Sequence, residues 1–133
     1  MANRNIQDAL LSNTTALTSS DGSVTSADFD LEQVAPGVVL EQIELVVVID
    51  ALLAAELNTA DTLTILLQGG ASAAPTTSLL ISKVLTGTGS AIAETTYRFR
   101  LPPDCPRYVN VKATSAGSTG DMSDKNMTCS LRF

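Results

Sequence analysis

Apolar and polar residues alternate along several short segments of this chain, with the period of two that is typical of half-buried β-strands. In TTYRFRL (95–101), the two rings and the leucine are predicted to face one side, and Arg98 and Arg100 the other. RYVNVKA (107–113) and KNMTCSLRF (125–133) alternate in the same way. These segments are therefore predicted to be strands with one face in a core and one face in water.

The whole chain reads as about eight short strands separated by turns rich in Gly, Pro, Ser and Asp. The predicted strands are two segments within 15–32 that flank an Asp-Gly turn, followed by 38–50, 61–68, 78–85, 95–101, 107–113 and 125–133.

One segment, ALLAAELNTA (51–60), has the strongest helix propensity and is predicted to form one or two helical turns within a connection. With a single place for a helix, parallel βαβ units are excluded. The predicted fold is all-β, an antiparallel two-sheet sandwich of jelly-roll type. Residues 1–13 are expected to be a short N-terminal arm, and 14–133 a single sandwich domain.

The most apolar window, 34–57, carries four carboxylates, which argues against a membrane span. The first thirteen residues are mostly polar, so no secretory signal is expected. Cys105 and Cys129 are therefore predicted to be reduced thiols.

Candidate catalytic residues are scarce, because the chain of 133 residues contains no histidine and no tryptophan. Cys105 lies in a proline-rich corner, PPDCP, where no neighbouring base could activate a thiol nucleophile. A small apolar corner residue is the simpler interpretation of this cysteine. The sequence thus predicts a protein that is not an enzyme and needs no cofactor.

Two groups of carboxylates could in principle hold a cation. Asp28, Asp30 and Glu32 share one face of a predicted strand, and Asp121 and Asp124 share a loop. Calcium requires six or more converging oxygen atoms, usually from a curved loop. A straight strand spreads its side chains apart, and the loop offers two carboxylates, so solvated surfaces are favoured and no metal site is predicted.

Arginines and aromatic residues interleave within 97–113, and this composition resembles that of a surface on which nucleic-acid bases stack. The alternation of side chains between the two faces of a strand argues against this function, because Tyr97 and Phe99 point away from Arg98 and Arg100. A net charge of −6 also removes the general attraction to phosphates. The outward basic face of Arg98, Arg100 and Arg107 is instead a candidate docking surface for an acidic partner.

The order of segments from 38 to 133 resembles the small capsid-stabilising proteins of short-tailed bacteriophages, known as cement or decoration proteins. The resemblance lies in a T-L-x-[VI]-x-L-Q strand (Thr62–Gln68), an arginine-bearing strand that ends in Leu-Pro (Arg98–Pro102), and an R-Y-[VL]-x-[VL] segment (Arg107–Val111). It covers about three quarters of the chain.

The resemblance implies a compact jelly roll on the outer capsid surface that bridges neighbouring major-capsid subunits. It further implies a homo-oligomer, a dimer or a trimer, made in the cytoplasm of the host bacterium, with neither nucleic acid nor membrane as a partner. The alternative interpretation is a non-enzymatic binding module, such as a carbohydrate- or receptor-binding β-sandwich of a virion or fibre.

Overall fold

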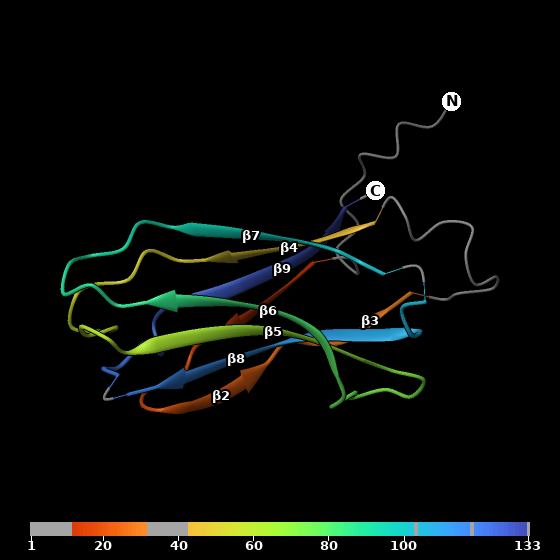
Figure 1. Cartoon of the computed structure of the whole chain (residues 1–133), viewed down its shortest axis with the longest axis horizontal. Helices are drawn as coiled ribbons and strands as arrows, with labels where there is room; N and C mark the ends of the chain where they lie inside the picture. Colours follow the sequence, from red (N-terminus) through yellow and green to blue (C-terminus); the bar gives the residue numbers. More distant parts are fainter. Residues whose placement is uncertain (1–11, 32–42, 103, 118, 133) are drawn as a thin grey trace.

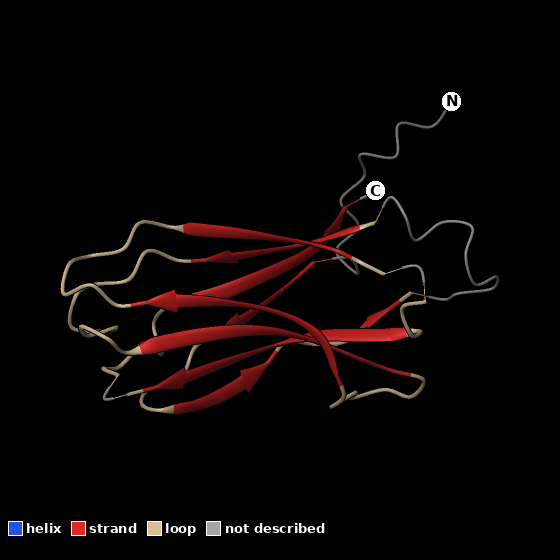
Figure 2. Ribbon diagram, viewed as in Figure 1, coloured by secondary structure: helices blue, strands red, loops and turns tan. Residues whose placement is uncertain are grey.

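The computed structural model describes residues 12–31, 43–102, 104–117 and 119–132, and this part of the chain is built from nine β-strands without a helix (Figures 1 and 2). The strands are β1 (Ser12–Ala16), β2 (Gly22–Thr25), β3 (Phe29–Asp30), β4 (Glu44–Ile49), β5 (Thr62–Gly70), β6 (Ser78–Thr86), β7 (Thr95–Arg100), β8 (Tyr108–Ala116) and β9 (Asn126–Arg132). The predicted all-β class is confirmed. No helix in the described ranges has the length and hydropathy of a membrane span.

The strands form two antiparallel sheets that lie as two layers (Figure 1). The first sheet has the order β1-β9-β4-β7. The second sheet has the order β2-β8-β5-β6, and β3 also pairs with β8 beyond the end of β2. The predicted antiparallel two-sheet arrangement is therefore confirmed. Within the described ranges, β2 and β3 are separate strands, interrupted at 26–28, where the sequence predicted one.

The pairing is nested along the chain. The first strand pairs with the last, β2 and β3 pair with β8, β4 pairs with β7, and β5 pairs with β6. Only the last of these pairs is a local hairpin, so most of the ladder joins segments that are far apart in sequence. Such a fold depends on long-range closure and is expected to form slowly.

The core lies between the two sheets. Its residues from the first sheet include Leu45, Val47, Ile49, Phe99, Met127, Cys129 and Leu131, and those from the second sheet include Leu63, Ile65, Leu67, Val109, Val111 and Ala113. Tyr97 is half-buried and packs against the same cluster. The assignment of inward and outward faces in the last three predicted strands is therefore correct.

The predicted order of strand, turn and strand around Asp21 is present, but β1 and β2 lie in different sheets, so the connection crosses between the layers and is not a hairpin. In 51–60, the predicted one or two helical turns are reduced to a single turn, in which the amide of Leu57 donates to the carbonyl of Leu53 at 3.4 Å, and no helix forms.

The boundaries differ modestly from the prediction. β1 begins at Ser12, inside the predicted arm, and the remainder of that arm lies outside the described residues. β5 continues through Gly70 into the predicted loop, after a register shift between Leu66 and Gln68.

The connection after β4 is held against the end of β6. The amide of Gly87 donates to the carbonyl of Asp61 at 2.9 Å, and the amide of Ala60 donates to the carbonyl of Gly87 at 3.0 Å. A Cβ at residue 87 would collide with the carbonyl oxygen of Asn58. Glycine is required here by the close approach of two backbones.

Strand β6 is an edge of the second sheet as described, and it carries an unusual inward lysine. Lys83 is the register partner of Ile65, a core residue, so its side chain starts from the inner face of the sheet, yet it is exposed. An inward-pointing charge at an edge strand discourages a further strand from pairing there.

Candidate functional site

The predicted docking residues Arg98 and Arg100 lie on β7, an edge strand of the first sheet. Their neighbours Tyr97 and Phe99 face the core, so both guanidinium groups point out of the sandwich. The Arg98 side chain is 56% exposed and pairs with Glu44, with 3.3 Å between Nη1 and Oε2. The outward basic face predicted from the alternation is present at this edge.

A third arginine joins this face through the strand register. Glu44 on β4 lies opposite Arg100 of β7 on one side and opposite Arg132 of β9 on the other. Arg132 is exposed, and directly opposed residues project from the same face of a sheet. Arg98, Arg100 and Arg132, hereafter the basic cluster, therefore surround one carboxylate and keep a net charge of about +2.

Arg107 lies apart from the basic cluster, because it comes just before β8 in the second sheet. Its Nε and Nη2 donate to the two carboxylate oxygens of Asp30 at 2.7 and 2.8 Å, and its guanidinium carbon lies 5.1 Å from the centroid of the Tyr108 ring. A bidentate pair of this kind holds the arginine in one orientation. Arg107 thus fastens β3 to β8, and the three arginines singled out from the sequence do not share one sheet.

The rest of the outer face of the first sheet carries small side chains. One row crosses the sheet as Thr14, Thr128, Val48 and Thr96. In the next row, Val46 and Ser130 are already buried, at 1% and 5% exposure. The accessible part of the face is therefore the basic cluster together with the threonine row, whose side chains are small.

The two cysteines are buried free thiols in the described structure. Burial, with a smaller contribution from the charge of Asp104, raises the pKa of Cys105 to about 11. Burial raises the pKa of Cys129 to about 12, although a hydrogen bond with Ser26 acts in the opposite direction and lowers this pKa. Both pKa values disfavour the thiolate, which is the nucleophilic form.

Native protein at pH 8 is accordingly expected to react with a thiol reagent at least about a hundredfold more slowly than urea-unfolded protein, in which both thiols have ordinary pKa values and full access. The measurement is the rate of colour release from a disulfide reagent. Rapid release from either cysteine in the native state would contradict the assignment of both thiols as inert.

The two predicted carboxylate groups do not gather around a common point. Asp28 accepts from the Asn110 side chain and the Ala74 amide, while Asp30 pairs with Arg107. In the loop, the hydroxyl and amide of Ser123 lower the pKa of Asp121. Glu32 lies outside the described residues. No three residues of the metal-binding types cluster within the ranges that the structure describes.

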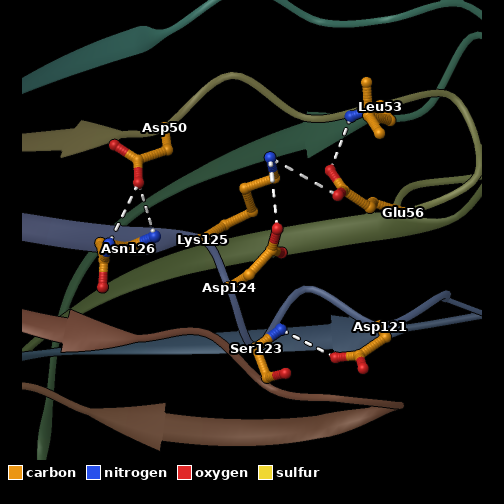
Figure 3. Close-up of polar contacts among 8 residues, drawn as sticks. All are labelled: Asp50, Leu53, Glu56, Asp121, Ser123, Asp124, Lys125 and Asn126. Carbon is orange, nitrogen blue, oxygen red and sulfur yellow. Dashed lines mark hydrogen bonds and ion pairs between the residues drawn. The ribbon is translucent and has the colours of Figure 1, made fainter.

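A polar cluster joins the connection after β4 to the loop before β9 (Figure 3). Lys125 lies between two carboxylates, with its Nζ 3.6 Å from Glu56 Oε1 and 3.7 Å from Asp124 Oδ2. Glu56 also accepts from the amide of Leu53 at 2.6 Å, and Asp50 accepts from the amide of Asn126 at 2.8 Å. These contacts fasten two long connections at one end of the sandwich and have a structural role.

Replacement of Lys125 by methionine is expected to lower the free energy of unfolding by about 1–2 kcal/mol. The side chains of Lys125 and Glu56 are 22% and 10% exposed, so the variant leaves a nearly buried carboxylate without its counter-charge. Urea denaturation measures the change, and the same substitution at the exposed Lys83 is the control. Equal losses in the two variants would refute a specific role for the Lys125–Glu56 pair.

In comparisons with known proteins, no family model and no curated protein sequence matches the chain.

Proposed function

We propose that this chain is a structural virion protein that binds the outer surface of a bacteriophage capsid and stabilises the shell by bridging neighbouring major-capsid subunits. The observation that carries the proposal is the basic cluster at the edge of the first sheet, exposed beside a row of small threonine and valine side chains. An exposed basic face of this kind suits a contact with an acidic protein surface.

The strand order supports a jelly roll in particular. When β2 and β3 are taken as one interrupted strand, the described ranges hold eight strand positions, and they pair first with last inward to β5 with β6. Jelly rolls of eight strands recur in viral capsid and lectin domains. The three segments that resemble decoration proteins fall on β5, on β7 with the residues after it, and on the start of β8.

We infer that the protein acts by binding alone, without catalysis or a cofactor. The sequence contains no histidine, and burial keeps both thiols protonated. Nucleic acid and membranes are not its partners in this proposal; the partner is the major capsid protein. The site of action is the capsid exterior, after synthesis in the cytoplasm of the host bacterium.

Self-association belongs to the same proposal. A capsid presents the same subunit contacts many times around local symmetry axes, and a symmetric dimer or trimer would engage several of them at once. Linked binding sites gain avidity because each later contact forms at a high effective concentration. Modest contacts made by the basic cluster can then give stable attachment when they are repeated in each protomer.

The test is co-sedimentation of the purified chain with expanded phage capsids and, separately, with isolated major-capsid subunits. The expected result is saturable binding to capsids, weak binding to single subunits, and a higher temperature of capsid disruption when the protein is bound. Sedimentation equilibrium should show a dimer or trimer. A protein that stays monomeric and does not pellet with capsids would refute the proposed function.

A further inference from the structure

A pocket of about 400 Å³ lies on the outer face of the second sheet, away from the basic cluster. Gln68 of β5 and Asn110 of β8 are register partners on its floor, and they project from the face opposite to the core residues Val109 and Val111. Lys112 and Asp28 also line it. The volume falls within the range of about 300–1,000 Å³ that is usual for small-molecule sites.

The wall of the pocket is the 71–77 connection between β5 and β6, and side chains of the sheet hold it in place. The Gln68 side-chain amide donates to the carbonyl of Thr76 at 3.0 Å. The Asn110 side-chain amide donates to the carbonyl of Pro75 at 3.2 Å, and the amide of Ala74 donates to Asp28 Oδ2 at 2.5 Å. The wall is therefore fastened to the floor at three successive residues.

Ala74 adopts a φ of 55°, in the left-handed region that residues with a Cβ rarely occupy. This conformation directs its amide toward Asp28. A strained backbone held in place by its surroundings is often found beside a binding site. The pocket is thus formed before any ligand arrives.

Asn110 supplies an acceptor that the described structure leaves unused. The residue is 2% exposed, and its Nδ2 donates to Asp28 Oδ1 at 3.0 Å and to the carbonyl of Pro75. Both partners are acceptors, which fixes the orientation of the amide. Oδ1 is buried and has no hydrogen-bond partner within the described ranges. A buried acceptor without a donor is destabilising, but Oδ1 is enclosed by the protein, so a ligand in the pocket would contact the other lining groups.

We propose that this pocket binds a neutral polyhydroxyl ligand, a single sugar unit of a glycan. The pocket combines an acceptor, the Asp28 carboxylate, with the cationic donor Lys112. A sugar hydroxyl both donates and accepts, so it can satisfy both kinds of group at once. The exposed Ala74 offers apolar surface to the C–H face of the ring. The inference is independent of the capsid role.

Charge distinguishes this ligand from its competitors. A phosphate or carboxylate would be attracted by Lys112 but repelled by the Asp28 carboxylate. An amine from a partner protein would be attracted by Asp28 but repelled by Lys112. A neutral ligand meets neither conflict. A sugar is small and its polar groups are strongly hydrated, so a dissociation constant in the millimolar range is expected.

The experiment is an NMR titration of the ¹⁵N-labelled full chain with the methyl glycosides of glucose, galactose, mannose and N-acetylglucosamine. At least one glycoside is expected to shift the Asn110 side-chain amide and the backbone amides of Ala74 and Thr76. Lys112→Met should weaken that binding about tenfold, since a charged donor is lost. Lys83→Met, the same change on the exposed edge strand outside the pocket, should bind like the wild type.

The dispersed spectrum of each variant reports whether it is folded, so a loss of binding cannot be mistaken for a loss of structure. Equal weakening by the two lysine substitutions would overturn the proposal, as would the absence of any glycoside-induced shift in the pocket. Shifts caused by Nα-acetyl-lysine amide and by none of the sugars would also overturn it, because the pocket would then receive a basic side chain of a partner.

Discussion

Replacement of Phe99 by alanine is expected to lower the free energy of unfolding by about 3–5 kcal/mol. The ring comes from β7, is 2% exposed, and belongs to the core between the two sheets. Its removal forfeits the burial of a large apolar side chain and leaves a cavity that the flanking strands can fill only in part. Urea denaturation followed by circular dichroism measures the loss.

Arg98→Ala is the matched control, since the two residues are adjacent on β7 and face opposite sides. Arg98 makes one exposed ion pair with Glu44, and such pairs contribute at most about 1 kcal/mol. The loss should therefore be several times smaller than for Phe99→Ala. Similar losses for the two variants would mean that the alternation in 95–101 does not separate a dry face from a wet one.

The double substitution Arg98→Glu with Arg100→Glu is expected to weaken attachment to capsids at least about a hundredfold, because like charges brought together at an interface cost several kcal/mol. Two positive charges of the basic cluster become negative, beside the existing carboxylate of Glu44. The weakened contact recurs in every protomer of an oligomer, so the avidity of the oligomer falls more steeply than the affinity of a single contact. Co-sedimentation at a series of protein concentrations gives the apparent dissociation constant.

Lys83→Glu changes charge in the same direction on an exposed strand of the other sheet and should leave attachment within about threefold of the wild type. Thermal unfolding of the double variant separates lost docking from lost structure. If the double variant binds capsids like the wild type while remaining folded, the basic cluster is not the docking surface.

Local alternation was sufficient to predict which side chains enter the core. In β7, β8 and β9, successive side chains point to opposite faces of the sheet, so the face that carries the apolar residues is the one that enters the core. It was not sufficient for 51–60, where helix propensity is high. There the backbone of Leu52 pairs with Ile92, and Leu52 and Leu57 are both buried, so tertiary contacts override the local preference.

The candidate docking surface was predictable in part, for the same reason. The outward positions of Arg98 and Arg100 follow from the alternation of faces within one strand. Arg132 belongs with them because β4 lies between β7 and β9 in a definite register. That register joins residues 44, 100 and 132, and no local pattern in the sequence encodes it.

The pocket was not predictable from the sequence at all. Asn110 occupies an outward position in an alternating strand, where a polar residue is expected to be solvated. Its burial comes from the 71–77 connection, which lies over it from a distant part of the chain. The signal that could have drawn attention to it is the polar pair of Gln68 and Asn110, once β5 and β8 are known to be neighbours.

Lys83 on β6 affects whether copies of this protein can associate along the edge of the second sheet. A second chain that extended the second sheet at this edge would lie beside the ammonium group of Lys83, whose removal from water costs free energy. Stacking of copies by this route is thereby disfavoured, which lowers the tendency of this edge to seed a fibre. In the proposed capsid role, copies that accumulate before assembly would have less tendency to polymerise along this strand.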